Sequence, residues 1–292
     1  MEKNSFVKIH GLGNEYVVLD SSNIDFKLTP RAIKRICNIH FGIGSDGIVM
    51  KVPSTKADFG FRVFNPDGSE AEKSGNGLRI FCKYVYDYGF ANSRQFSVET
   101  LKDIVYAEIV EEEAGKAMLI KVDMGKAIFK SREIPVNSDL PEFLGQKIMA
   151  GDREFTVNCV SVGNPHCVVV TDKLDLDIVK KYGPLLENHP MFPNRINVQF
   201  ARPLSDHHAE MLIWERGAGH TLASGSSSCG CSSVLVKLGL VKGDLTMHME
   251  GGELKIQIDR DFSIRMTGPV REISRGVLSD ELIADLEEEM PD

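Results

Sequence analysis

The stretch that decides the fold is Phe64-Asn-Pro-Asp-Gly-Ser-Glu-Ala-Glu-Lys-Ser-Gly-Asn-Gly77, because a second stretch of the same design follows it. The second reads Trp214-Glu-Arg-Gly-Ala-Gly-His-Thr-Leu-Ala-Ser-Gly-Ser-Ser227 and begins 150 positions after the first. Each stretch runs through a glycine-containing turn into a Ser-Gly pair. The spacing predicts one duplicated unit, fused into a single chain. We therefore expect a pseudo-symmetric cleft in which Ser74 and Ser224 face each other.

The same offset relates an earlier pair of asparagines. Asn14 and Asn164 each stand 60 positions before the serine of their own half. In both halves, strand patterns lead into a mostly apolar helical run, predicted over Leu78–Tyr88 and Cys229–Leu238. A helix that is apolar on most sides must be enclosed by other elements. The sequence therefore predicts an α+β fold of two pseudo-symmetric domains, each a curved mixed or antiparallel β-sheet wrapped around a central helix.

The length of 292 residues suits two domains of ordinary size. We expect the N-terminal half at residues 1–125, joined by a returning C-terminal segment at 268–292. The C-terminal half is expected at residues 126–267. One further helix is predicted over Thr29–Ile39, with Thr29 as its N-cap, and another over Leu176–Tyr182.

The composition, 42% apolar and 26% charged, is that of a soluble globular protein. The net charge of −8 arises mainly in residues 279–292, which carry seven acids and no base, whereas the remainder has 35 acids and 34 bases. Such a balanced body offers no basic footprint for nucleic acid. We expect the acidic tail to be a solvated or frayed end. No stretch has the pattern of a signal peptide or a membrane span, which predicts a cytoplasmic protein.

Three further patterns are expected to carry no chemistry. The six cysteines lack framework spacing and are predicted to be reduced thiols, with Cys229-Gly-Cys231 packed in a helix. The glycines of Gly42–Gly47 follow a helix and precede a strand, the reverse of a dinucleotide motif. Asp206-His207-His208 is expected to be a surface turn without partner ligands, and His248 likewise. We predict no metal, pyridoxal phosphate or nucleotide cofactor.

The two Ser-Gly elements differ from these patterns because each meets the start of a buried helix. Free backbone N–H groups and the positive end of the helix dipole suit a carboxylate there. Serine is also a preferred N-cap residue, so each serine taken alone is explained as an ordinary cap. Two such helix starts at equal offset beside glycine-rich turns favour a ligand site.

At these residues the chain resembles the diaminopimelate epimerase family of cofactor-independent amino-acid racemases. The likeness extends from about Phe6 to Val277. The motifs that carry it are Lys8-Ile-His-Gly-Leu-Gly-Asn14, Phe64-Asn-Pro-Asp-Gly-Ser69, Ser74-Gly-Asn-Gly77 with Arg79, Gly163-Asn-Pro-His166, Asn194-Arg-Ile-Asn197, Trp214-Glu-Arg-Gly-Ala-Gly219 and Met266-Thr-Gly-Pro269.

The resemblance implies a reaction in which one proton leaves an amino-acid Cα and another returns to the opposite face. In the family a cysteine pair at the starts of the central helices does this, one as thiolate and one as thiol. Matched position by position, those cysteines fall on Ser74 and Ser224, the two expected catalytic positions. A serine hydroxyl is a much weaker base than a thiol of pKa about 8.5 unless a neighbour activates it.

The resemblance also implies the substrate contacts. The reacting end of the amino acid is expected to be held by Asn14 and Asn76 and by the backbone at Gly75, Gly225 and Ser226. The far end of diaminopimelate is expected to meet Asn65, Asn164, Asn197, Glu215 and Arg216. An arginine can fork onto a carboxylate and a glutamate can pair with an ammonium. The first half carries an asparagine and a proline, at 65 and 66, where the second half carries Glu215 and Arg216. This difference between the halves favours a long, asymmetric zwitterion as the ligand.

His220 is a second departure, because the family usually carries glutamate at this position. It lies four positions before Ser224, and histidine titrates near neutrality. His220 is therefore a candidate helper of Ser224, or the base itself. The alternative is a loop histidine that hydrogen-bonds the backbone.

Three functions remain open at this point. The chain is a diaminopimelate epimerase whose cysteines were replaced to trap a ligand, or a natural relative with altered chemistry, or a non-catalytic amino-acid-binding protein. His220 and the run Ser226-Ser-Ser228 favour the second, whose reaction would be a proton shift or an elimination, as in isomerases and dehydratases of this fold. We predict the family reaction: interconversion of LL- and meso-diaminopimelate in lysine and peptidoglycan precursor synthesis, or racemisation of a related amino acid. The resemblance also implies a homodimer, because members of the family often form one.

Overall fold

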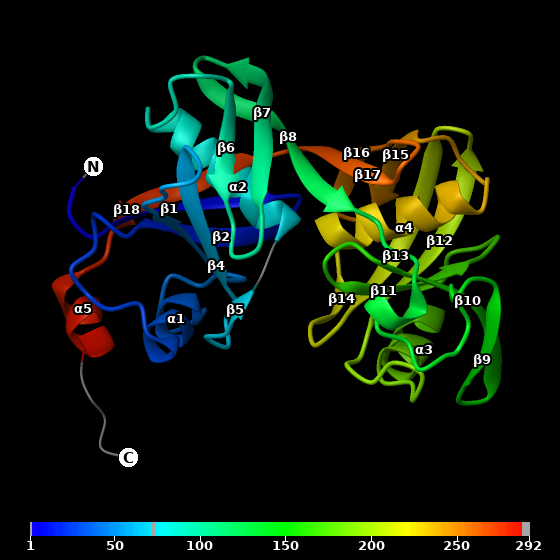
Figure 1. The fold of residues 1–292 in the computed structure, drawn as a ribbon. Helices are drawn as coiled ribbons and strands as arrows, with labels where there is room; N and C mark the ends of the chain where they lie inside the picture. Colours follow the sequence, from blue (N-terminus) through cyan, green and yellow to red (C-terminus); the bar gives the residue numbers. More distant parts are fainter. Residues whose placement is uncertain (1, 72–73, 288–292) are drawn as a thin grey trace. The chain divides into compact units, whose positions relative to one another are not determined.

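The computed structural model describes residues 2–71 and 74–287. The chain divides into two compact units, the first comprising residues 1–122 and 268–292 and the second residues 123–267 (Figure 1). Each unit has its own mixed sheet and its own central helix. The predicted α+β fold class is thereby confirmed.

The first unit is a sheet whose strands pair in the order β18, β1, β2, β3, β4, β6, β7 and β8, with the short β5 beside β6 on the same edge of β4. The β2–β3 and β4–β6 pairs are parallel, because a connection that contains a helix joins each of them. The elements are β1 (Ser5–Gly11), β2 (Asn14–Asp20), α1 (Pro30–Cys37), β3 (Ile48–Val52), β4 (Phe59–Phe64), β5 (Glu70–Ala71), α2 (Gly75–Asp87), β6 (Gln95–Glu99), β7 (Ile104–Glu113), β8 (Lys116–Lys126), β18 (Arg271–Val277) and α5 (Asp280–Glu287).

The second unit repeats this plan. Its strands pair in the order β9, β10, β11, β12, β13, β15 and β16, followed by β17, and the short β14 pairs with β13. The β11–β12 and β13–β15 pairs are the parallel ones. The elements are the 3₁₀ turn η1 (Ser131–Glu133), β9 (Gln146–Ala150), β10 (Arg153–Ser161), β11 (Pro165–Val170), α3 (Leu176–Glu187), β12 (Asn197–Ser205), β13 (His208–Glu215), β14 (Gly219–Thr221), α4 (Gly225–Lys237), β15 (Asp244–Met249), β16 (Gly252–Ile258) and β17 (Ser263–Pro269).

The pairing registers show the duplication directly. Val17 faces Ile48 in the β2–β3 pair, and Cys167 faces Val198 in the β11–β12 pair, so both partners shift by 150 positions. The β3–β4 and β12–β13 pairs keep the same offset, as do the β4–β5 and β13–β14 pairs. Register is set by which side chains must be buried. The two halves therefore share the same distribution of inward and outward positions.

The central helices α2 and α4 contain 13 residues each and begin directly after Ser74 and Ser224. Both serines have extended backbone angles, and each side-chain oxygen accepts a first-turn N–H, which is the N-cap arrangement. Helix α2 packs on β1 to β4, and α4 packs on β10, β11, β12, β15 and β16. Their predicted enclosure is confirmed. The sheets thus hold both helix starts in fixed positions within their own units.

A second helix covers the opposite face of each sheet. In the first unit Ile33 and Ile36 of α1 join the apolar cluster built on β2 and β3. In the second unit Val179 and Leu186 of α3 do the same on β11 and β12. Because both faces are covered, strands such as Val17-Val18-Leu19 are continuously apolar rather than alternating.

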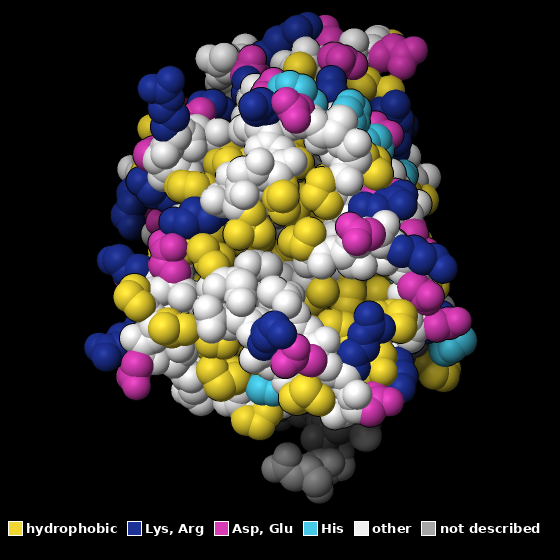
Figure 2. Space-filling model, turned by 90° about the vertical axis from the view of Figure 1, so that its right-hand side faces the viewer, with side chains coloured by type: hydrophobic (Ala, Val, Ile, Leu, Met, Phe, Trp, Pro, Cys, Tyr) yellow, Lys and Arg dark blue, Asp and Glu magenta, His cyan; other side chains and the backbone are white. Residues whose placement is uncertain are grey.

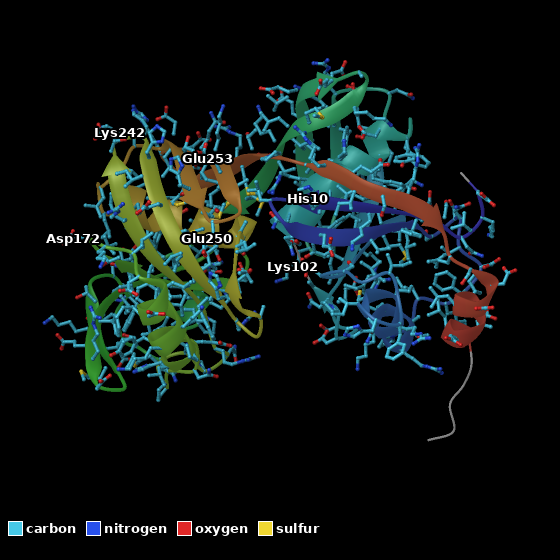
Figure 3. All side chains as sticks on the ribbon, turned by 180° about the vertical axis from the view of Figure 1, so that it is seen from behind. His10, Lys102, Asp172, Lys242, Glu250 and Glu253 are labelled. Atoms are coloured by element: carbon cyan, nitrogen blue, oxygen red, sulfur yellow. The ribbon has the colours of Figure 1, made fainter. Side chains whose placement is uncertain are left out.

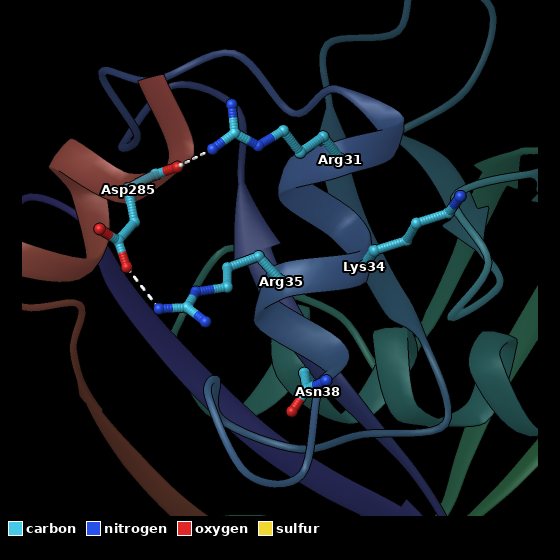
Figure 4. A pocket seen from close by; sticks show the side chains of 5 residues that line it. All are labelled: Arg31, Lys34, Arg35, Asn38 and Asp285. Atoms are coloured by element: carbon cyan, nitrogen blue, oxygen red, sulfur yellow. Dashed lines mark hydrogen bonds and ion pairs between the residues drawn. The ribbon is translucent and has the colours of Figure 1, made fainter. Parts of the chain in front are cut away.

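The acidic C-terminal segment forms a helix in its described part, so a frayed end is ruled out there, although its acids Asp280, Glu281 and Glu287 are exposed to solvent as predicted. Helix α5 packs against α1, as the close-up in Figure 4 shows. Leu286 is buried, and the Asp285 carboxylate pairs with Arg35 while its backbone carbonyl accepts a bond from Arg31. Apolar residues at 282, 283 and 286 give the segment one apolar stripe, which explains why it docks. Residues 288–292 lie outside the described part.

Positive and negative side chains are interspersed on the face drawn in Figure 2, in agreement with the balanced charge of the sequence. None of the helices within residues 2–71 and 74–287 has the length and apolar character of a membrane span.

Candidate active site

Ser74 lies at the start of α2 in the first unit. Its Oγ accepts a hydrogen bond from the Gly77 backbone N–H at 3.0 Å and lies 3.3 Å from the Tyr16 hydroxyl. Among the residues that the structure describes, no carboxylate or imidazole forms a hydrogen bond with this hydroxyl. Ser74 is therefore a helix cap with a phenol as its neighbour. The sequence did not single out Tyr16, although it occupies the repeat position of His166.

The predicted pair Asn14 and Asn76 lies beside this helix start. Asn76 Nδ2 donates to Asn14 Oδ1 at 3.1 Å, so the structure brings the two amides together. The backbone N–H groups of Gly75 and Asn76 precede the first intrahelical bond of α2, which leaves them for a cap or a ligand. The first unit thus presents a group of N–H donors at the start of α2.

Ser224 occupies the same position at the start of α4 but has a different partner. Its Oγ donates to Glu215 Oε2 at 3.0 Å and accepts from the Ser227 N–H at 3.4 Å. The Glu215 carboxylate also accepts the Thr221 hydroxyl at 2.6 Å. Ser224 is only 5% exposed, so this bond lies where little water competes. A carboxylate that accepts a hydrogen bond from a hydroxyl is placed to act as its general base.

Asn164 and Ser226 also meet at the start of α4. Asn164 Nδ2 donates to Ser226 Oγ at 3.2 Å, and Asn164 Oδ1 lies 2.9 Å from His166 Nε2. Burial, with a smaller contribution from the Arg216 charge, lowers the pKa of His166 to about 3, so this imidazole is neutral at physiological pH. A neutral ring with its proton on Nε2 donates to Asn164 Oδ1 and orients the amide.

Of the other residues predicted to contact the far end of a substrate, Asn197 is the first residue of β12, whereas Asn65 and Arg216 lie in loops. Asn197 Oδ1 accepts the Arg216 backbone N–H at 3.0 Å, and Arg216 Nη1 donates to the Asn194 carbonyl at 3.1 Å. These two predicted residues are therefore brought together in the second unit. In the first unit Asn65 Nδ2 donates to Ser69 Oγ at 3.0 Å, within the turn that precedes α2.

The buried carboxylate of Glu187, at the end of α3, fixes the loop that carries Arg216. It accepts hydrogen bonds from Trp214 Nε1 at 2.8 Å and from the Gly217 N–H at 2.9 Å. Sequence reasoning missed Glu187, because nothing near it in the sequence marks it as a partner of a loop 30 positions away.

His220 bonds to a different group from the one expected. Its Nε2 lies 2.5 Å from Glu250 Oε2 at the β15–β16 turn, where Figure 3 labels Glu250. Within the described residues no hydrogen bond joins His220 to Ser224, whose hydroxyl donates to Glu215. The helper role of His220 stays a prediction, and Glu215 is the titratable residue that forms a hydrogen bond with the Ser224 hydroxyl.

The turn at His207 and His208 has a neighbour that the sequence did not indicate. His208 Nδ1 lies 3.0 Å from His248 Nε2, so the expectation that no partner lies nearby is wrong. The two strands that carry them, β13 and β15, pair in parallel although they are separated by α4 in the sequence. Within the described part of the chain, no three side chains of the types that bind metal come together.

The cysteines of the chain are buried and unbridged. Burial raises the pKa of the Cys82 and Cys231 thiols, which lie in the two central helices, well above the usual range. They are therefore neutral packing groups, as predicted for Cys229-Gly-Cys231, and are not thiolate bases. The residues that cap the two helix starts are Ser74 and Ser224.

The model of the diaminopimelate epimerase family matches residues 6–130 and 158–273, which is most of the chain. The chain belongs to this family. A diaminopimelate epimerase 2 from Nostoc sp. is 48% identical over 280 residues, covering 96% of this chain and 97% of that protein. The diaminopimelate epimerase of Acetivibrio thermocellus is 42% identical over 272 residues, covering 93% and 97%. The predicted family and enzyme class, an isomerase of the racemase and epimerase type, are confirmed.

Solved structures share the diaminopimelate epimerase fold at much lower identity. A probable proline racemase from Agrobacterium radiobacter superposes with a TM-score of 0.70 at 12% identity, over 94% of this chain and 93% of that one. A hydroxyproline epimerase from Agrobacterium vitis gives 0.68 at 14% identity, over 93% and 90%. At these identities the likeness shows the fold alone, and the residues of this chain must define its own chemistry.

Proposed function

We propose that this protein interconverts LL- and meso-diaminopimelate by proton transfer at Cα, without a cofactor. The observation that carries the proposal is the Ser224 hydroxyl, which donates to the Glu215 carboxylate at the start of a buried helix. Ser74 has the equivalent position in the duplicated unit. The names of the relatives, which are diaminopimelate epimerases at 37–48% identity, support this substrate.

The proposed reaction uses the two serines on opposite faces of one amino acid. Glu215 takes the hydroxyl proton of Ser224 while the serine oxygen takes the Cα proton, and the hydroxyl proton of Ser74 goes to the carbanion. Solvent then returns Ser74 and Glu215 to their starting protonation states. Neither proton transfer requires a thiol, but the Ser74 half has no carboxylate partner in the described residues. We therefore expect a rate well below that of a cysteine enzyme.

The ligand contacts are proposed from the donors and acceptors that each unit offers. N–H groups at Gly75, Asn76, Gly225 and Ser226, with the amide of Asn14, suit the carboxylate of the reacting end. For the far end, Arg216 suits the second carboxylate, and the amides of Asn65, Asn164 and Asn197 supply directional bonds. We also propose, from the resemblance to the family, a homodimer and a place in lysine biosynthesis.

Proton NMR in D₂O with LL-diaminopimelate tests the proposal through the α-proton signal. Loss of the signal together with appearance of the meso form is the expected result. Saturable binding without loss would make the protein a binder whose serines do not act as bases. Absence of both binding and exchange would refute diaminopimelate as the ligand.

A further inference from the structure

Four polar side chains form a continuous hydrogen-bonded chain at the helix start of the first unit. Arg79 Nη2 donates to Asn76 Oδ1 at 2.7 Å, Asn76 Nδ2 donates to Asn14 Oδ1 at 3.1 Å, and Asn14 Nδ2 donates to Asp46 Oδ2 at 2.9 Å. We call this chain the amide relay. It joins α2, the start of β2 and the loop between α1 and β3.

The two ends of the amide relay fix its direction. A guanidinium only donates hydrogen bonds, so the Asn76 atom that faces Arg79 must be the amide oxygen. An ionised carboxylate only accepts them, so the Asn14 atom that faces Asp46 must be the amide nitrogen. Both ends therefore require that, in the bond between the two asparagines, Asn76 Nδ2 donates to Asn14 Oδ1. The orientation of both amides therefore follows from chemistry and does not depend on telling oxygen from nitrogen by position.

The relay determines what a ligand meets at this helix start. Each amide nitrogen has two N–H bonds and uses one of them in the relay. Within the described residues no second partner is present for Asn14 Nδ2 or Asn76 Nδ2, so one N–H of each remains. The backbone N–H groups at the start of α2 add further donors. The first unit therefore offers a set of donors, while each amide oxygen faces the donor that precedes it in the relay.

The second unit has the same asparagine but not the same relay. The repeat positions of Asn76, Arg79 and Asp46 are a serine, a cysteine and an isoleucine, at 226, 229 and 196. There the Asn164 nitrogen, not its oxygen, faces the residue on the central helix. The directed relay thus belongs to one half only.

We infer that Asp46 and Arg79 are positioning residues that hold the Asn14 and Asn76 amides with their nitrogens toward the ligand, so that this half accepts a carboxylate and rejects its amide. The inference rests on the proposed function for the identity of the ligand, but not for the relay itself. Arg79 is completely buried and Asp46 is exposed, so the exposed end is the one to change without disturbing the core.

The test replaces Asp46 by Asn in the full chain. Asp46 Oδ2 also accepts the Glu15 backbone N–H at 3.0 Å. An asparagine there is neutral and carries one N–H group in place of an acceptor, so its bond to Asn14 Nδ2 is weaker and no longer requires one orientation of the Asn14 amide. The matched control is Asp58→Asn, in the same unit, because the exposed Asp58 carboxylate also accepts two bonds, one from the Ser97 N–H and one from its hydroxyl, both at 2.7 Å. Two readouts are compared: the side-chain amide NMR signals of the two asparagines, and the ratio of affinities for LL-diaminopimelate and its diamide.

We expect Asp46→Asn to shift the Asn14 amide signals and to lower the acid-to-amide ratio about tenfold, the equivalent of one hydrogen bond. Asp58→Asn should leave both unchanged. A general loss of structure would weaken binding of both ligands by the same factor and would leave their ratio unchanged. A lowered ratio therefore reports on the relay itself, and an unchanged ratio in a folded Asp46→Asn variant overturns the inference. If no form of the protein binds diaminopimelate, the proposed substrate is wrong, and unchanged Asn14 signals in Asp46→Asn would still overturn the relay.

Discussion

Replacing Ser74 and Ser224 together by cysteine tests whether the two helix starts are the proton-transfer positions. A thiol with a pKa of about 8.5 is a few per cent thiolate at neutral pH, and a helix N-terminus raises that fraction. Positioned acid–base catalysis contributes roughly 10²–10⁴-fold. We therefore expect the double variant to exchange the α-proton of LL-diaminopimelate about 10²–10⁴ times faster than the serine protein.

The same substitutions should reduce stability, because both serines are N-caps. The cap bond of Ser74 is 3.0 Å long and that of Ser224 is 3.4 Å, so the first is the stronger. Loss of an N-cap costs about 0.5–2 kcal/mol. With the lower end for Ser224, the double variant should lose about 1–2.5 kcal/mol of unfolding free energy. For a chain of this size that is a fall of roughly 2–10 °C in the melting temperature.

The assay is deuterium exchange followed by proton NMR, with Ser93→Cys as the control for an added exposed thiol. Each single cysteine variant should show slower epimerisation than the double variant, because one face keeps a serine. A double variant that binds LL-diaminopimelate and melts at the expected temperature, yet exchanges no faster than the serine protein, would refute the assignment of the two positions.

Three more predictions concern other parts of the structure. Glu215→Gln should slow α-proton exchange at least tenfold, as loss of a general base does, whereas an equal effect of Glu250→Gln would shift the helper role to the histidine that Glu250 contacts. The pKa of His166 is near 3 in the folded state and about 6.5 in the unfolded state, so between these pH values the unfolded state binds the proton. The contribution of His166 to stability is therefore complete above pH 6.5, and the unfolding free energy falls by up to about 1.4 kcal/mol per pH unit between pH 6.5 and pH 3. Urea titrations at several pH values should find a smaller fall in His166→Gln. Leu286→Ala should lower the unfolding free energy by about 2 kcal/mol or more in the same titrations, while Leu140→Ala, at an exposed position, should change it by less than about 0.5 kcal/mol.

The sequence predicted the duplicated fold because the repeat offset survives in the strand registers, but it misplaced several element ends. The helix predicted from Leu78 begins at Gly75, since burial and the Ser74 cap outweigh the poor helix propensity of two glycines. Helix α3 was expected to end at Tyr182 and continues through Gly183 to Glu187. A Cβ at Gly183 would lie 2.6 Å from Trp214, so this glycine marks a close packing contact and not a helix end.

The candidate site was only partly predictable, for a related reason. The asparagines and serines stand in motifs that recur at a fixed offset, and the sequence shows them directly. Their partners do not: Tyr16 reaches Ser74 across 58 positions, and Asp46 reaches Asn14 across 32. The second pair forms because β2 and β3 lie side by side, and the first because α2 packs on β2. The contact between Glu215 and Ser224 is closer in sequence, but it depends on the turn back from β13 to α4.

The duplicated backbone and the diverged side chains together explain how a symmetric fold can serve an asymmetric ligand. Position 16 places a phenol on Ser74, whereas its counterpart at 166 places a neutral imidazole on Asn164. Position 65 carries an amide, whereas its counterpart is the Glu215 carboxylate that accepts from Ser224. Each change leaves the helix starts and registers intact while it alters the donors and acceptors around them. If one duplicated half supplies donors and the other an acidic group, Asn65→Glu should weaken binding of LL-diaminopimelate in a calorimetric titration, because a second carboxylate would then stand among the contacts proposed for the far carboxylate of the ligand.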